Sequence, residues 1–259
     1  MRSNPVSISL SSYGATFVRQ RGQEHFLDLL AAAGVARVEL REELFDSAPD
    51  TAVLAAAIAA SNLECLYSTP LELWTEQGLP DTRLSQKLAL ARSLGAVALK
   101  VSLGHYNDTC DVSALRTLLP EDGPLLLVEN DQTEQGGRIA PMLGFFQRVD
   151  DLGLPVGMTF DIGNWQWQAQ SAQQAAHKLG RWVRYVHCKA VDRLPDGRRV
   201  AVPPDADDLQ AWDALLRAFT PGVVRAVEYP LAGDDLLALT RAHVSALSML
   251  GLGQEVSHA

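Results

Sequence analysis

Short apolar runs alternate with longer amphipathic segments along the chain. The runs are rich in valine, leucine and isoleucine, which is typical of strands buried on both faces. The segments between them repeat their apolar residues at helical spacing. The eight runs that we predict to be strands are Val6–Leu10, Val35–Leu40, Leu63–Ser68, Ala96–Ser102, Leu125–Asn130, Val156–Asp161, Val183–Lys189 and Val223–Tyr229.

The segments between and after these runs are predicted to be helices. Three of them are followed by Gly34, Gly95 or Gly153, at the position where a left-handed residue commonly ends a helix. The regular order of strand and helix favours βαβ units around a parallel sheet. The predicted helices are Glu24–Ala33, Thr51–Ser61, Thr82–Leu94, Ile139–Leu152, Ala172–Trp182, Leu209–Phe219 and Asp234–Leu250.

The spacing of the strands predicts a particular α/β fold. Successive runs begin 27 to 40 residues apart, and the chain has 259 residues. Eight such units form a (β/α)8 barrel of roughly 250 residues. We therefore expect a single TIM-barrel domain over residues 1–259. An open doubly wound sheet is the alternative, but its GxGxxG motif would follow the first strand, where this chain has Ser11-Ser12-Tyr13-Gly14.

One predicted connection is unusually long. The segment Ala190–Asp208 follows the seventh strand and contains Pro195, Gly197, Pro203 and Pro204. Loops longer than about 12 residues often serve as lids or binding loops. We expect this segment to cover the barrel mouth.

Composition narrows the classes of partner. Lys and Arg number 22 against 31 Asp and Glu, a net charge of −9, which disfavours binding to nucleic acid or anionic lipid. The longest alanine-rich apolar stretch, Ala52–Ala60, is far short of a membrane span. The N-terminal residues lack the apolar core of a signal peptide, and the three cysteines lack CxxC spacing. These features favour a cytoplasmic protein with reduced thiols and with neither a nucleic-acid nor a membrane partner.

Charged residues end four consecutive predicted strands. The apolar runs lead into Glu129, Asp161, His187 and Glu228. The carboxyl ends of TIM-barrel strands carry the chemistry, and a charge there costs several kcal/mol unless it is paired, neutralised or bound to a metal. An ordinary ion pair or core histidine would explain any one of these residues. All four at equivalent positions predict a single site for a divalent cation such as Mn²⁺, Mg²⁺ or Co²⁺, with positions left for water or substrate.

Cationic residues also lie at or just past the strand ends, which is unexpected in an acidic chain. They are Arg41, Lys100, Lys189 and Arg193. An anionic substrate, such as a sugar acid or keto-sugar acid, would explain them. The alternative is that they pair with neighbouring carboxylates such as Glu39, Glu43 and Asp192. Arg193 is the strongest substrate candidate because a guanidinium can bind a carboxylate through two parallel hydrogen bonds.

Several motifs resemble those of a known group of enzymes. Val128-Glu129-Asn130, Phe160-Asp161-Ile162-Gly163-Asn164, Val186-His187-Cys188-Lys189 and Val227-Glu228-Tyr229 together resemble the xylose-isomerase-like TIM-barrel superfamily of sugar isomerases and epimerases. Residues 9–14, 39–45 and 128–133 resemble, more closely, the epimerases of 2-ketogluconate utilisation. The resemblance to the superfamily covers the whole chain in order.

The resemblance implies a metal-dependent isomerase acting on a small carbohydrate. It implies that Glu129, Asp161, His187 and Glu228 bind one divalent ion, with Mn²⁺ expected and Mg²⁺, Co²⁺ or Zn²⁺ as alternatives. Glu129 and Glu228 would also be the acid/base residues, acting through an enediolate, and Lys189 and Arg193 would face the substrate. Such barrels often form homo-oligomers. The sequence does not separate epimerisation from aldose–ketose isomerisation.

Further substrate contacts are expected around the mouth. They are Asn164, Trp165 and Trp167, which follow Asp161, and His105 and Tyr106 after the fourth strand. For the two tryptophans, packing on the neighbouring helix is the alternative. Ketose 3-epimerases commonly have a histidine where this chain has Asn164 and a glutamate where it has Gln135. These departures put the hydroxyl contacts, and a simple free ketose as substrate, in question.

Three other functions are weighed against an isomerase. A metal-dependent keto-sugar or polyol dehydratase would use the same site and is poorly excluded. A noncatalytic sugar-binding barrel has no need of two metal-linked glutamates. An AP-endonuclease-like enzyme would use several histidines and a basic groove, whereas only one of six histidines lies at the predicted metal rim and the pI is about 5.1.

Overall fold

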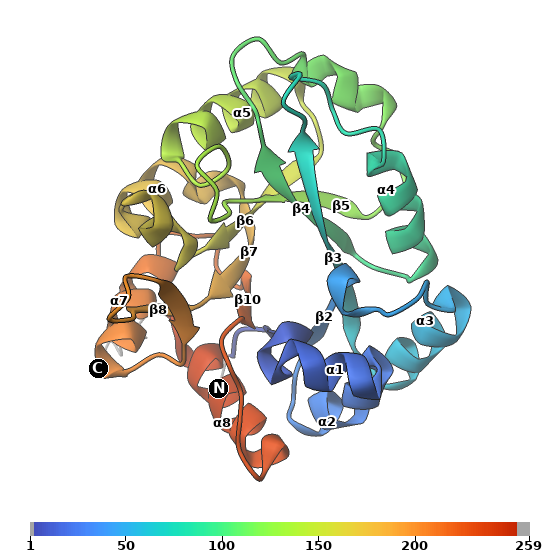
Figure 1. The fold of residues 1–259 in the computed structure, drawn as a ribbon, viewed down its shortest axis with the longest axis vertical. Coiled ribbons are helices and arrows are strands. Elements are labelled where there is room, and N and C mark those ends of the chain that lie inside the picture. The colour runs from blue at the N-terminus through green and yellow to red at the C-terminus, as the bar shows by residue number, and fades with distance from the viewer. Residues whose placement is uncertain (1–2, 253–259) are drawn as a thin grey trace, which may run out of the picture.

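The fold is described from a computed structural model, in which residues 3–252 are placed well enough to describe. Eight parallel strands close into a barrel in the order β1-β10-β7-β6-β5-β4-β3-β2, with helices around the outside (Figure 1). This confirms the predicted (β/α)8 fold. The barrel strands are β1 (Val6–Ser9), β2 (Arg37–Arg41), β3 (Glu64–Trp74), β4 (Ala98–Gly104), β5 (Leu125–Glu129), β6 (Val156–Asp161), β7 (Val183–Cys188) and β10 (Val224–Val227).

The helices lie close to their predicted positions, with one addition. Helix α1 was not predicted, because Val18 is its one buried residue and its apolar stripe is therefore too weak to read. Between β4 and β5 the described chain forms a 3-10 helix, Val112–Thr117, where no helix was predicted. The α-helices are α1 (Ala15–Arg21), α2 (Leu27–Ala32), α3 (Thr51–Ala60), α4 (Leu84–Ser93), α5 (Ile139–Leu152), α6 (Ala172–Leu179), α7 (Ala206–Leu216) and α8 (Leu236–Met249). Within residues 3–252, no helix is long and apolar enough to span a membrane.

Strand β3 runs past its predicted end. The expected strand stopped at Ser68, before Thr69 and Pro70, but the observed strand continues to Trp74. Its pairing with β4 shifts register between Ser68 and Glu72, and Pro70 lies in that irregularity. A proline, which has no N–H to give to the ladder, is tolerated at such a bulge.

The long connection after β7 is a hairpin. Strands β8 (Ala190–Arg193) and β9 (Arg199–Val202) pair antiparallel and form a small sheet separate from the barrel. Gly197 turns the chain at a φ of 88°, a left-handed conformation that glycine adopts without strain. The segment expected as an irregular lid is thus partly an ordered hairpin that directly follows a barrel strand.

Two separate apolar clusters show which way the strand residues face. The large cluster packs between the strands and the helices, and a small one fills the barrel interior. Because side chains alternate along a strand, residues two positions beyond the inner cluster also face inward. The inner cluster is Leu66, Ala98, Leu127, Tyr185 and Ala226. The next inward positions are Ser68, Lys100, Glu129, His187 and Glu228.

Candidate metal centre

The four predicted metal ligands meet at the carboxyl end of the barrel. Glu129, Asp161 and His187 lie at the ends of β5, β6 and β7, and Glu228 directly follows β10. One ligand atom from each lies within 4.8 Å of all the others. His187 Nδ1 is 2.7 Å from Glu129 Oε1, 3.0 Å from Glu228 Oε2 and 3.8 Å from Asp161 Oδ2. The parallel register produces this convergence, since Asp161 and Ala226 both pair with His187 across adjacent strands.

The donor atoms fit a divalent ion. Glu129 Oε1 and His187 Nδ1 are buried and face each other, yet neither makes a hydrogen bond. An unsatisfied buried polar atom costs about 1 to 3 kcal/mol, so such atoms in a native site call for an explanation. An ion between them would satisfy both, and three carboxylates with one imidazole are donors that Mn²⁺, Zn²⁺ and related ions accept. These residues could hold one metal ion.

Asn130 and Asn164 hold Asp161 in place. The Asn130 side chain accepts the backbone N–H of Asp161 and donates to its carbonyl oxygen, both at 2.9 Å. The backbone N–H of Asn164 donates to Asp161 Oδ1 at 2.9 Å, which leaves Oδ2 directed to the other ligands. Asn164 Nδ2 in turn donates to the Asn130 carbonyl. The Asn164 amide, expected to contact substrate, is therefore buried and engaged in positioning a ligand.

Every carboxylate ligand also contacts a cation. Lys100 pairs with Glu129 Oε2, while Lys189 Nζ lies 2.7 Å from Asp161 Oδ2 and 2.9 Å from Glu228 Oε2. Arg41 reaches Glu228 Oε1 at 2.7 Å and also pairs with Glu43 and Glu39. Pairing with neighbouring carboxylates, the alternative considered for these cations, is thus confirmed for Arg41.

The electrostatics keep both proposed acid/base glutamates ionised. Burial opposes the charge, but Lys100 and His187 lower the pKa of Glu129 to about 2. Burial would also raise the pKa of Glu228, but His187, Lys189 and Arg41 outweigh burial and hold this pKa well below its ordinary value. In contrast, burial raises the pKa of Asp161 despite Lys189. The two glutamates do not have pKa values moved to opposite sides of neutrality, as one acid and one base would require.

Glu39 belongs to the site although the sequence analysis considered it only as a partner for cations. It lies on β2, is fully buried, and places Oε2 2.7 Å from His187 Nε2. The available signal was a charged residue inside the apolar run Val35–Leu40. Its contact with a residue on β7 could not be read from spacing, because β1 and β10 separate those strands.

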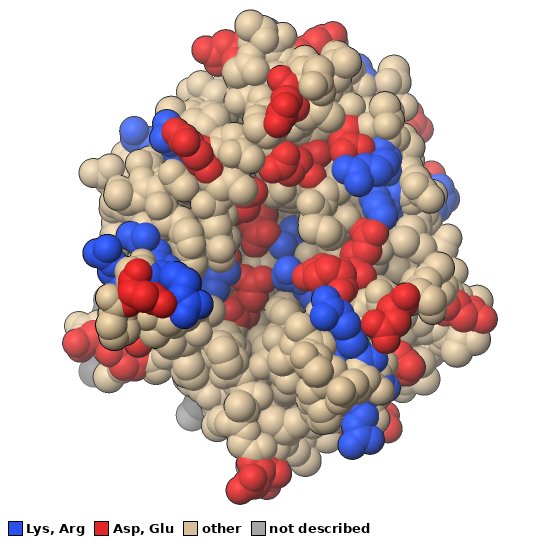
Figure 2. Space-filling view, viewed as in Figure 1, with Lys and Arg blue, Asp and Glu red and all other residues tan. Residues whose placement is uncertain are grey.

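The remaining expected contacts occupy different places. Lys189 lies inside the centre, whereas Arg193 is exposed on β8, directly opposite Arg199 in the hairpin register. Trp165 is fully buried against Phe160, with ring centroids 5.5 Å apart, so its indole offers no exposed face to a sugar. In Figure 2, acidic and basic side chains line a hollow at the centre of the face in view, and further basic side chains stand where Figure 1 shows β8.

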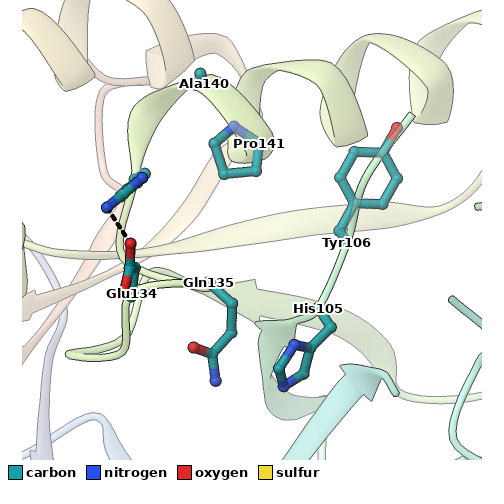
Figure 3. A pocket seen from close by; sticks show the side chains of 7 residues that line it. His105, Tyr106, Glu134, Gln135, Ala140 and Pro141 are labelled. Atoms are coloured by element: carbon teal, nitrogen blue, oxygen red, sulfur yellow. Dashed lines mark hydrogen bonds and ion pairs between the residues drawn. The ribbon is translucent and has the colours of Figure 1, made fainter. Parts of the chain in front are cut away.

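His105 lies in a second hollow at the rim. Its Nε2 is 3.6 Å from Glu72 Oε2, and Gln135 Nε2 donates to the other Glu72 oxygen at 3.0 Å. Figure 3 shows the His105 and Gln135 side chains next to each other, with Tyr106 and Pro141 across the hollow. The two positions singled out from sequence, His105 and Gln135, therefore meet through one carboxylate.

Known structures share the fold. No protein-family model and no curated protein matches the sequence. An IOLI protein with a zinc atom is 14% identical, with 94% of this chain and 98% of that chain covered and a TM-score of 0.69. D-psicose 3-epimerase from Clostridium cellulolyticum H10 is 13% identical over 94% and 96% of the two chains, with a TM-score of 0.66. The probable 3-DHS dehydratase AsbF from Bacillus anthracis is 12% identical over 94% and 98%, with a TM-score of 0.62.

At identities of 12 to 14%, these structures show the fold of the chain, and its activity has to be inferred from the residues of the site. The resemblance to xylose-isomerase-like barrels is confirmed at that level, and the matching structures include sugar epimerases. The narrower resemblance to epimerases of 2-ketogluconate utilisation stays a prediction.

Proposed function

We propose that this protein is a divalent-metal-dependent sugar epimerase or isomerase that moves a proton at a carbon next to a carbonyl. The observation that carries the proposal is the convergence of two ionised glutamates on the same unsatisfied atom. Glu129 and Glu228 approach His187 Nδ1 to 2.7 and 3.0 Å from strands that lie three apart around the barrel. That arrangement supplies a carboxylate on either side of a substrate carbon held between them.

The chain's own groups account for the proton transfers. A bound divalent ion would supply Lewis-acid polarisation of the carbonyl, worth several kcal/mol. Glu129 and Glu228 are ionised and so begin as bases, and positioned bases of this kind contribute roughly 10²- to 10⁴-fold. Lys189, whose Nζ lies 2.9 Å from Glu228 Oε2, is the proposed proton donor for the return step. The cycle closes when the glutamate that took the first proton releases it to solvent and Lys189 regains one. Removal on one face and return on the other gives epimerisation.

Charge balance supports a substrate that bears one negative charge. The buried centre holds four carboxylates, from Glu39 and the three acidic ligands, against the cations of Arg41, Lys100 and Lys189. A divalent ion with neutral His187 changes this balance to a single positive charge. The carboxylate of a keto-sugar acid would neutralise it, whereas an enediolate formed by proton transfer to a glutamate leaves the total charge of the site unchanged. For the acid, Arg193 is the proposed contact, because Arg199 directly opposite makes that edge of the hairpin cationic.

A dehydratase is the second candidate. The same enediolate can expel a neighbouring hydroxyl instead of taking its proton back, and one structure of this fold is the probable 3-DHS dehydratase. The buried ammonium group of Lys189 beside two ligand carboxylates could then protonate the leaving hydroxyl.

Solvent-deuterium exchange tests both candidates. The metal-loaded protein is incubated in D₂O with a panel of keto-sugars and keto-sugar acids, and NMR identifies the labelled carbon. Epimerisation or isomerisation gives label next to a carbonyl, whereas dehydration gives an unsaturated product. Neither label nor product across the panel would contradict the proposal.

Metal analysis tests the centre on its own. Asp161→Ala and His187→Ala each remove one ligand, so both variants should lose most of the Mn²⁺ or Zn²⁺ that the parent binds. Elemental analysis after dialysis measures it. Ligand variants that retain metal as well as the parent would show that the ion lies elsewhere.

A further inference from the structure

His187 is held between two different sets of oxygen atoms. On one side, Nε2 is 2.7 Å from Glu39 Oε2. On the other, Nδ1 faces Glu129 and Glu228 and makes no hydrogen bond. An ionised carboxylate only accepts hydrogen bonds, so the ring nitrogen that faces Glu39 must carry a proton. In a neutral ring the other nitrogen, Nδ1, then has its lone pair free.

Glu39 is itself held firmly. It is fully buried, and its Oε2 accepts a hydrogen bond of 2.9 Å from the Tyr185 hydroxyl. The same hydroxyl lies 2.8 Å from Ser7 Oγ. The other oxygen, Oε1, is 3.2 Å from Arg41 Nη1. Lys100 Nζ lies 4.0 Å from the same Oε1, so two cations face this carboxylate. The carboxylate therefore stays charged and in a defined orientation.

The position of Glu39 shows what this costly group does. A buried charge costs several kcal/mol, and Glu39 is not one of the four residues whose ligand atoms converge. Its hydrogen bonds and ion pairs go to His187, Tyr185 and the cations of the centre. His187 is the one of the four ligands that Glu39 contacts directly, whereas Arg41 and Lys100 lie between Glu39 and the ligands Glu228 and Glu129.

We propose that Glu39 is a positioning residue that keeps the proton on His187 Nε2 and so presents Nδ1 to the metal ion. This inference rests on the proposed metal centre and adds a residue from β2 to it. Carboxylates in this position orient the imidazole and make it a stronger ligand, and their loss typically weakens metal binding 10- to 100-fold. The hydrogen bond from the Tyr185 hydroxyl holds the Glu39 carboxylate in its orientation.

The main test is Glu39→Gln, which preserves size but removes the charge. Calorimetric titration with Zn²⁺ should show a dissociation constant raised roughly 10- to 100-fold over the parent. The matched control is Glu64→Gln on the neighbouring strand β3, where a mostly exposed carboxylate pairs with Arg37. That control should bind Zn²⁺ like the parent. Thermal unfolding in excess chelator shows whether each variant is folded.

A second readout does not depend on affinity. In ¹⁵N-labelled, Zn²⁺-loaded parent, NMR should show the His187 proton on Nε2, strongly hydrogen-bonded and slow to exchange. In Glu39→Gln this proton signal should move to the position of a weaker hydrogen bond. If Glu39→Gln does not fold, Tyr185→Phe removes one hydrogen bond to the carboxylate and should weaken Zn²⁺ binding several-fold.

The outcomes separate this inference from the metal centre. Equal Zn²⁺ affinity in parent and Glu39→Gln would overturn the role of Glu39 and leave the centre standing. A proton on Nδ1 in the loaded parent would overturn that role and also remove His187 from the ligand set. A parent that binds no Zn²⁺ would overturn both. Weakened binding together with the shifted proton signal would support the inference.

Discussion

Two successive layers of side chains fill the barrel, and they differ in chemistry although the same strands supply both. The lower layer is the apolar cluster that contains Leu127 and Tyr185. One inward step further along the same strands come Glu129 and His187, and with them the rest of the charged centre. Successive residues of a strand face opposite sides of the sheet, so every second residue faces the barrel interior. Two positions along the same strand therefore separate an inward residue of the apolar cluster from an inward residue of the charged centre.

The layers also differ in what holds them together. The apolar layer is stabilised by burial and close packing. The charged layer is held by opposite charges that balance one another, and removing one member leaves its partner buried and unpaired. We therefore expect substitutions of the aliphatic residues in the lower layer to change stability, and substitutions in the upper layer, or of the Tyr185 hydroxyl that contacts it, to change metal binding and activity.

The largest effect is expected from the two glutamates of the charged layer. Glu129→Gln and Glu228→Gln keep an oxygen donor but lose the titrating group, so kcat should fall by roughly 10²- to 10⁴-fold. Initial rates at saturating metal and substrate measure it, with the chelator-treated proteins compared by thermal unfolding. Near-parental turnover by both variants would remove these residues from the proton transfers.

The lower layer should respond in the opposite way. Leu127→Ala leaves a cavity directly beneath Glu129 and should lower the free energy of unfolding by about 2 to 5 kcal/mol. Because no charged group is lost, the Zn²⁺ affinity of the folded protein should change little. Urea denaturation and calorimetry measure the two quantities. A large loss of affinity with little loss of stability would contradict the division into layers.

The sequence allowed the fold and the charged layer to be predicted for the same reason. Apolar runs at regular spacing define the strands, and a charged residue that ends such a run, like Asp161, is conspicuous. Contacts across the barrel are harder to predict from the sequence. Glu39 meets His187 only because closure brings β2 opposite β7, and no local pattern encodes that distance.

Other differences come from packing around the barrel. Trp165 was expected at the mouth from its place after Asp161, but Phe160 and the core provide a better environment for its ring. The hairpin that carries Arg193 lies in a segment for which no strand was predicted, yet its two short strands pair in register. In each case tertiary contacts decided a position that local sequence left open.

The rim extends the comparison to substrate recognition. Arg193 is exposed, unlike the cations of the centre, so its removal should leave the fold and metal binding intact. Loss of a charge-assisted contact costs about 1.5 to 3 kcal/mol, and Arg193→Ala should therefore lower kcat/KM for a keto-sugar acid roughly 10- to 100-fold. A neutral ketose should be affected much less. If both substrates suffer equally, or if the parent prefers neutral ketoses throughout, the anionic substrate should be abandoned.

The last effect expected is a pH dependence of metal binding that is confined to the charged layer. Burial disfavours the charged form of His187, but Glu228, Glu39 and Glu129 outweigh it and raise the pKa of the imidazole well above its ordinary value in the metal-free protein. A histidine whose pKa is raised by folding stabilises the folded protein. This contribution is fully present below the pKa of the unfolded chain, about 6.5, and is lost as pH rises through the pKa of the folded protein. Metal needs the neutral ring, so it competes with this proton.

Zn²⁺ affinity should therefore rise with pH, by at most about tenfold per unit for this one proton, and level off above the pKa of His187. Glu129 adds no slope near neutrality because its pKa is about 2. Calorimetry from about pH 6 to 8, repeated in buffers of different ionisation enthalpy, counts the protons released. Glu39→Gln removes one carboxylate that holds the His187 proton, so its affinity should level off at lower pH, whereas Leu127→Ala in the apolar layer should follow the parent curve. A flat profile in the parent would mean that His187 is already neutral, and that Arg41, Lys100 and Lys189 leave one of the four carboxylates of the charged layer without a matching positive charge.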